Sequence, residues 1–489
     1  MSHGFLGRLF RTSSIEAIRA EHAKDTGLRK VLRGRDLVAI GLGTMIGGGI
    51  FTTIGPGVHK AGPAVVIAFV LAGMASLFAA LCYAELGSMI PSAGSAYTFA
   101  YASLGQVIGW IIGWNLILEY AISAAPVAQQ FSQSLQEAIR SAGGGALPDH
   151  LQKAVWSSGS VDLIGALFIA ILTLLIVIGI RETASANNAL VVIKIAALLV
   201  FIVTGFTLFH PQNLADFNPV GWIGPLDADA IPTGIFGAAG LVFFTYIGFD
   251  TATTTAEECR NPKRDIPVGV IGSLLIGTAL YCAVAVVLVG AVPWKSVNVD
   301  TPLQSALAPL HLPWAEWVIR IGVLAGTSSV ALVSLLGQSR IFFAMARDGM
   351  MPPAIAAISK RFGTPVRMSI ITGVVVMGLT LIVPLDALLA MVNIGTMSAF
   401  VAVCAGVIVL RLKRPDLPRP FRTPVWPFTT VAGIVVTSLL GVLGLGARTF
   451  YLFLGWLVVG LILYFIYGYR HADPRRPAAV PLAEPPDFG

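Results

Sequence analysis

The sequence predicts an all-α integral membrane protein with twelve transmembrane helices, ten of which form a five-plus-five inverted repeat with broken helices 1 and 6. Three observations predict this fold. The 489 residues are 56% hydrophobic and only 12% charged, whereas soluble domains carry about 25% charged residues. Apolar runs long enough to cross a bilayer recur along the chain. Two of these runs, at matching positions of the two halves, are interrupted near their centres.

The apolar runs follow one another with short polar segments between them. Each is expected to be a helix, because in lipid a single segment must satisfy its own backbone hydrogen bonds. The expected spans are about 37–58, 63–90, 104–135, 161–180, 188–209, 232–256, 267–292, 316–346, 368–385, 387–410, 428–447 and 450–469.

A polar connector, 210–230, separates five spans from the next five. Five is an odd number, so the second set must cross the membrane in the opposite sense to the first. The predicted organisation is a cytoplasmic amphipathic N-terminal segment, a first repeat, a second repeat, helices 11 and 12, and a cytoplasmic tail. These units are expected at 1–36, 37–209, 232–410, 428–469 and 470–489.

Lysine and arginine predict the orientation. They gather in the N-terminal segment, in the even-numbered loops and in the tail, and they are sparse in the odd-numbered loops. The positive-inside rule then places both termini in the cytoplasm. The basic N-terminal segment suits a bacterial inner (plasma) membrane, and an organelle membrane is the alternative. The net charge of +7 follows from this distribution. We therefore expect membrane lipid as a partner and no nucleic acid.

The first apolar run contains three consecutive glycines near the middle of the bilayer. Each costs a helix interior about 1 kcal/mol relative to alanine, and non-helical backbone at that depth is tolerated only inside protein or along a cavity. We predict a break whose second half offers free N–H groups to a carboxylate. Close helix packing through small residues is the alternative. The predicted substrate contacts here are Met45, Ile46, Gly47, Gly48, Gly49 and Ile50.

The sixth run is also a weak helix, because its middle carries Tyr246, Gly248 and Asp250. Its first half should end with unpaired carbonyl groups that suit an ammonium. The two helix ends together complement a zwitterion, which is the form of an α-amino acid. Asp250 has an alternative role as the N-cap of the helix that continues after the break. The predicted substrate contacts here are Phe244, Thr245, Ile247 and Asp250.

Two charged residues lie deep within apolar runs, Glu119 in the third and Lys194 in the fifth. Ionisable residues at such positions are functional candidates. We predict that Lys194 exchanges a proton with the aqueous phases and couples transport to the proton gradient, and that Glu119 is the second candidate. The alternatives are that Lys194 reaches back to the membrane surface, and that Glu119 only bonds two helices together.

Motifs for catalysis and metal binding are absent from the sequence. It contains no HExxH, no GxSxG and no phosphate-binding loop, and its four cysteines lack metal-ligand spacing. We therefore expect no enzymatic activity, no catalytic residue, no metal and no cofactor.

Three stretches of the chain resemble the cationic amino acid transporter family of the amino acid–polyamine–organocation superfamily. They read GTMIGGGIF, FFTYIGFDTATTTAEECRNPKRDIPVGV and GQSRIFFAMARDGMMP. The resemblance implies amino acid uptake by alternating access, driven by protons in bacterial members. It also implies a carboxylate site at Gly47, Gly48 and Gly49, an amine site at the carbonyl groups of Phe244 and Ile247, and a proton-linked Lys194. Gly48 departs from many members, which have Thr, Ala or Ser there.

The expected function is thus a secondary active transporter that imports amino acids as a proton symporter. An exchanger of amino acids or amines is the first alternative. A membrane sensor that binds an amino acid without moving it is the alternative from a different class.

Overall fold

The computed structural model describes residues 7, 9–16, 18 and 32–472, apart from 93, 145–147, 149–150, 152–153, 157–160, 179–182, 228–230, 358 and 360–363. Most of the expected N-terminal amphipathic helix and most of the tail lie outside these residues. Within them the regular structure is helical, with two isolated β-bridges. The helical prediction is therefore confirmed for the described part of the chain.

Helices occupy each of the apolar runs that the sequence indicates. The first and sixth runs each hold two α-helices with a short non-helical stretch between them, which in the sixth run is preceded by a 3₁₀-helix. The third run is continuous but includes a π-helical segment. The α-helices are α3 (Gly34–Met45), α4 (Gly48–Ala61), α5 (Val65–Met89), α6 (Ser95–Leu104), α7 (Gln106–Ile117), α8 (Ala124–Ser141), α9 (Leu163–Ile178), α10 (Thr183–Phe206), α11 (Gly234–Val242), α12 (Thr251–Thr254), α13 (Pro262–Ala291), α14 (Pro302–Leu307), α15 (Pro313–Arg347), α16 (Pro353–Ala356), α17 (Val366–Ile382), α18 (Leu385–Lys413), α19 (Phe428–Gly444), α20 (Ala447–Leu463) and α21 (Tyr469–His471).

Eight helical segments in the described residues are long and apolar enough to cross a membrane, and α9, α17 and α19 are shorter apolar helices. Many of their large apolar side chains are exposed, for example Val203 on α10 and Val442 on α19. Exposed apolar side chains along a helix need a hydrocarbon environment. The chain is therefore an integral membrane protein.

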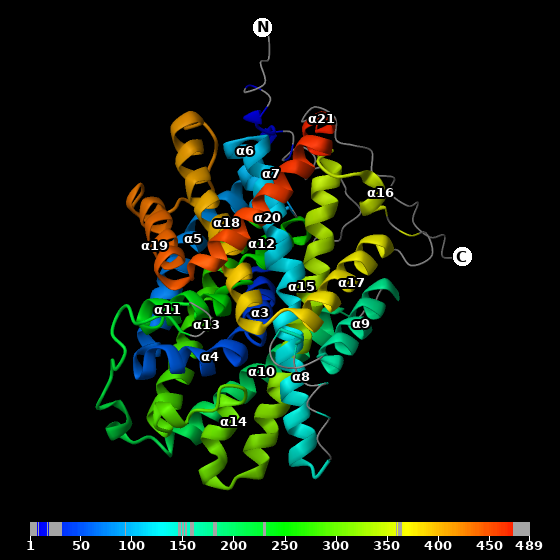
Figure 1. Ribbon diagram of the computed structural model, residues 1–489. Helices are drawn as coiled ribbons and strands as arrows, with labels where there is room; N and C mark the ends of the chain where they lie inside the picture. The colour runs from blue at the N-terminus through cyan, green and yellow to red at the C-terminus, as the bar shows by residue number, and fades with distance from the viewer. Residues whose placement is uncertain are drawn as a thin grey trace.

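Short helices lie at two opposite ends of the molecule (Figure 1). Helices α6, α16 and α21 lie at one end, whereas α14 and the C-terminal end of α8 lie at the other (Figure 1). Two contacts of the long helices position the site described below. Helix α10 packs against α15 and α3, and α13 packs against α3 and α5. The first half of the broken first run, α3, is therefore held by α10 on one side and by α13 on another.

Candidate functional site

The first apolar run is interrupted at Ile46 and Gly47. Helix α3 ends at Met45, Ile46 is extended, and Gly47 has φ = 132° before α4 begins at Gly48. Only glycine adopts such a backbone conformation readily. A side chain at Gly47 would also collide with α15, since its Cβ would lie 2.5 Å from the carbonyl oxygen of Gly326. Gly47 is thus required both by the break and by the packing.

Close packing also explains the next two glycines. A Cβ on Gly48 would lie 2.7 Å from Cγ2 of Val127, and a Cβ on Gly49 would lie 2.4 Å from Cα of Thr245. The packing alternative therefore holds together with the break, and does not replace it. No described side chain caps the first turn of α4, so the backbone N–H groups there remain open to an acceptor.

The second interruption follows α11 and a 3₁₀-helix, η5 (Phe243–Tyr246). Ile247 is extended and Gly248 has φ = 117°, and α12 begins three residues later. A Cβ on Gly248 would lie 2.7 Å from Cβ of Thr44 on α3, so the two breaks touch. The carbonyl group of Phe244 already accepts the N–H of Ile247 at 3.2 Å. It therefore offers a ligand one lone pair, whereas the sequence had predicted an unpaired group.

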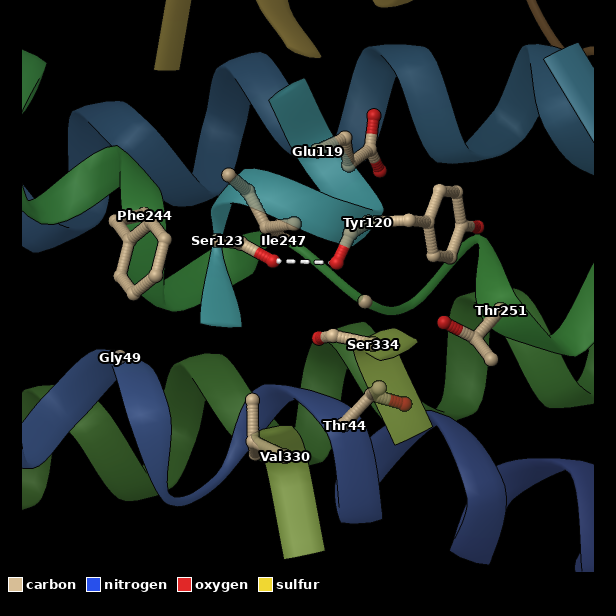
Figure 2. A pocket seen from close by; sticks show the side chains of 11 residues that line it. Thr44, Gly49, Glu119, Tyr120, Ser123, Phe244, Ile247, Thr251, Val330 and Ser334 are labelled. Atoms are coloured by element: carbon tan, nitrogen blue, oxygen red, sulfur yellow. Dashed lines mark hydrogen bonds between the residues drawn. The ribbon is translucent and has the colours of Figure 1, made fainter. Parts of the chain in front are cut away.

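A narrow cavity lies between the two breaks (Figure 2). Its free volume of about 20 Å³ holds little more than one water molecule, so a larger solute enters only if the surrounding helices separate. The lining comes from both broken runs, from the third run and from α15. The lining residues are Thr44, Gly49, Glu119, Tyr120, Ser123, Phe244, Ile247, Gly248, Thr251, Val330 and Ser334.

The predicted site residues divide into two groups. Gly49, Phe244, Ile247 and Glu119 line the cavity. The others lie behind its wall, at the breaks or in contact with the lining: Met45, Ile46, Gly47, Gly48, Ile50, Thr245, Asp250 and Lys194.

Asp250 does not cap the helix that follows it. It occupies the N-cap position of α12, but its side chain makes no capping bond. The carboxyl oxygen Oδ2 instead accepts a hydrogen bond from the hydroxyl group of Tyr120 at 2.8 Å. The capping alternative is therefore wrong, and Asp250 reaches the cavity through Tyr120. The other oxygen, Oδ1, is buried and has no partner among the described residues.

Glu119 lies in a π-helical segment, η2 (Leu118–Ile122), between α7 and α8. Such segments occur often at functional sites. The side chain is buried and lines the cavity, and neither carboxyl oxygen has a hydrogen-bond partner in the described structure. No hydrogen bond among the described residues therefore supports the alternative in which Glu119 only bonds two helices together. Glu119 and Asp250 are close enough to interact electrostatically.

Lys194 is completely buried on α10. Its Nζ donates hydrogen bonds to the carbonyl oxygens of Gly43 and Ile46, the latter at 2.8 Å, and to Oγ of Ser329 on α15 at 3.2 Å. The alternative in which Lys194 reaches the membrane surface is wrong. The ammonium instead lies at the C-terminal end of α3, where the free carbonyl groups and the helix dipole favour a cation.

Polar contacts also join the elements on either side of the cavity. Arg340 and Arg347 of α15 form ion pairs with Glu258 and Glu257, at 3.3 and 3.9 Å. Elsewhere Lys60 of α4 forms an ion pair with Asp227 of the connector. The first two contacts join α15 to the segment that follows α12, and the third joins α4 to the connector.

Several lining residues were not predicted from the sequence. They are Thr44, Tyr120, Ser123, Gly248, Thr251, Val330 and Ser334. Tyr120 and Gly248 were within reach, because they adjoin Glu119 and the second break in the sequence. Val330 and Ser334 are four residues apart on α15 and therefore share a helix face, but nothing in their residue types distinguishes that face from the others.

Comparisons with known proteins show the family of this chain. A sequence model of the family described as amino acid permease matches residues 32–467. The chain is 39% identical to the branched-chain amino acid permease BcaP of Bacillus subtilis, over 95% of this chain and 99% of the relative. It is 36% identical to the methylthioribose transporter of the same organism, over 96% and 99%. It is 40% identical to the vacuolar cationic amino acid transporter 4 of Arabidopsis thaliana, over 80% and 64%. This chain therefore belongs to the amino acid permease family.

Proposed function

We propose that this protein imports amino acids across the bacterial plasma membrane by alternating access, as a proton symporter. In this proposal the helices make twelve spans, the first ten form two inverted sets of five, and both termini are cytoplasmic. Membership in a family of permeases supports transport as the activity. The observation that carries the proposed coupling is the contact between Lys194 and the backbone of the first break.

The substrate is proposed to bind between the two helix breaks as a zwitterion. Its carboxylate lies against the uncapped first turn of α4, near Gly49, where the backbone N–H groups and the helix dipole attract an anion. Its ammonium lies near the carbonyl groups at the end of η5, next to Ile247. Burial of both charges is tolerable because each meets oriented backbone dipoles.

Coupling is proposed to run through the end of α3. When Lys194 is protonated, its ammonium bonds the carbonyl groups of Gly43 and Ile46 and fixes α3 relative to α10 and α15. A neutral lysine carries no positive charge, so its hydrogen bonds to these two carbonyl groups are weaker. Release of a proton toward the cytoplasm then loosens α3 next to the cavity, which provides the differential contact that alternating access needs.

The relatives leave the side chain of the substrate open, since their names refer to branched-chain amino acids, cationic amino acids and methylthioribose. Within the cavity, Glu119 provides acceptor oxygens that no described residue uses. We propose that these oxygens receive a donor from the substrate, either an amino group or a basic side chain.

Uptake into proteoliposomes tests the function. Labelled amino acids, neutral and cationic, are supplied with and without an imposed pH gradient, and counterflow is measured without a gradient. Accumulation only with the gradient supports symport. Counterflow without gradient-driven accumulation supports an exchanger, and saturable binding with no counterflow supports a sensor. Amino acid methyl esters or des-amino acids that compete as well as the parent would refute the zwitterion site.

A further inference from the structure

We infer that a groove between α13 and the loop after α18 binds the headgroup of an anionic phospholipid. The groove is lined by Lys263, Arg264, Pro267, Val268, Ile271, Gly272, Pro420 and Phe421. It is separate from the substrate cavity and shares no lining residue with it. The inference does not depend on the proposed transport mechanism.

The mouth of the groove carries two unneutralised cations. Lys263 and Arg264 lie in the first turn of α13, are exposed, and form no ion pair with a described residue. The neighbouring acid, Asp265, does not pair with them. Its Oδ1 accepts the N–H of Gly34 at 3.0 Å and its Oδ2 accepts the N–H of Asn261 at 2.9 Å. The positive charge at this end of α13 is therefore available to an external anion.

An apolar strip continues from these cations along α13. Val268 is 46% exposed and Leu275 is 52% exposed, and Ile271 and Gly272 lie between them. The spacing of three, four and seven residues places them on one face of the helix. A cationic mouth that leads into an exposed apolar strip fits an amphiphile with an anionic head and an acyl chain. A soluble phosphate would use only the mouth.

The opposite wall of the groove is fixed in place. Pro420 and Phe421 lie between Arg419 and Thr423, both of which contact the buried carboxylate of Glu85 on α5. Nε of Arg419 lies 3.3 Å from Oε1, and the N–H of Thr423 donates to Oε2 at 2.7 Å. Glu85 is buried in the core. The loop is therefore ordered, with Phe421 against the groove, before a ligand binds.

The groove also lies next to the support of α3. Asp265 binds the first N–H of α3, and the backbone of Leu32 pairs with Glu258 and Arg260 just before α13, at 3.1 and 2.9 Å. A lipid bound at Lys263 and Arg264 is therefore close to the helix whose other end holds Lys194.

Lipid binding to the purified full-length protein tests the inference. Phosphatidylglycerol and phosphatidylcholine with identical acyl chains are titrated and bound lipid is counted by native mass spectrometry. The first variant is Lys263→Gln/Arg264→Gln. Its matched control is Arg367→Gln/Lys413→Gln, which removes two exposed cations that have no described ion-pair partner. A second variant, Val268→Trp, adds bulk to the apolar part of the groove and leaves the charges in place.

Phosphatidylglycerol should bind the wild type and the control pair more tightly than phosphatidylcholine does. The Lys263→Gln/Arg264→Gln pair should weaken its binding by about thirtyfold, since each cation near an anionic lipid contributes roughly fivefold. Val268→Trp should also weaken it. Equal binding of the two lipids, an equal loss in the control pair, or displacement of the lipid by millimolar glycerol phosphate would overturn the inference, the last because it would show a site for soluble phosphate.

Discussion

Lys194 donates a hydrogen bond to the carbonyl oxygen of Ile46 at 2.8 Å and thereby joins α10 to the last turn of α3. Ile46 is the residue at which the first run leaves the helix. The lysine therefore holds the backbone at the point where it is least supported by its own helix. In the proposed mechanism, a charge at this position acts on the geometry of the cavity between the two breaks, although Lys194 does not line it.

Lys194→Ala should abolish accumulation of substrate driven by an imposed pH gradient. The variant loses the titrating group proposed to hold the C-terminal end of α3, and sodium should not substitute. Substrate binding should survive, because the amino acid is proposed to be held by helix ends. Uptake and equilibrium binding measured on the same preparation check both parts. Lys413→Ala, at an exposed site, is the control. If Lys194→Ala still concentrates substrate, the coupling group lies elsewhere and Glu119 is the next candidate.

Tyr120→Phe should weaken substrate affinity by about tenfold or more. It removes the hydrogen bond to Asp250 and leaves a buried carboxyl oxygen without this partner, which costs about 1–3 kcal/mol. Competition binding measures the effect. Tyr281→Phe is the matched control, since Tyr281 is equally buried and its hydroxyl group has no partner in the described structure. Equal affinities for the two variants would show that the Tyr120–Asp250 bond is not part of the site.

Glu119→Gln should distinguish neutral from cationic substrates. If a basic side chain pairs with Glu119, affinity for lysine or arginine should fall about tenfold relative to alanine or leucine, because a charged hydrogen bond becomes a neutral one. Competition against one labelled substrate gives both affinities. Glu316→Gln is the control, because Glu316 lies in the first turn of α15 and its carboxylate is paired with Arg320. An equal fall for all substrates would assign Glu119 to the amino group or to proton transfer instead.

Gly49→Ala should destabilise the protein and abolish transport. Its Cβ would lie 2.4 Å from Cα of Thr245, a backbone atom that cannot rotate away, and overpacking of this kind costs about 1–3 kcal/mol or more. Thermal unfolding in detergent and uptake measure the two effects. Gly378→Ala on α17 is the control, because its Cβ would meet nothing within 4 Å. Wild-type stability of Gly49→Ala would mean that the two broken runs do not approach as closely as described.

The membrane class, the helical secondary structure and the two interruptions could be predicted from the sequence. Hydropathy and glycine content depend on local residue type, and lipid allows few backbone structures. Three glycines in an apolar run and Gly248 before Asp250 therefore indicate breaks from residue type alone. The sequence also limits Lys194 to two outcomes. A lone lysine inside an apolar run either reaches the membrane surface or finds hydrogen-bond acceptors in the protein.

Only the tertiary structure decided what these residues contact. Asp250 has the sequence context of an N-cap, yet its carboxylate binds Tyr120 of another span. Lys194 could have reached the surface, but α10 packs against α3 and α15, so carbonyl groups of α3 and Ser329 surround its ammonium. The lining residues of α15, Val330 and Ser334, were not predicted, because packing between distant segments decides which face of α15 lines the cavity. Residue type determines whether a group can be buried, whereas the partners that make its burial favourable come from parts of the chain more than a hundred residues away.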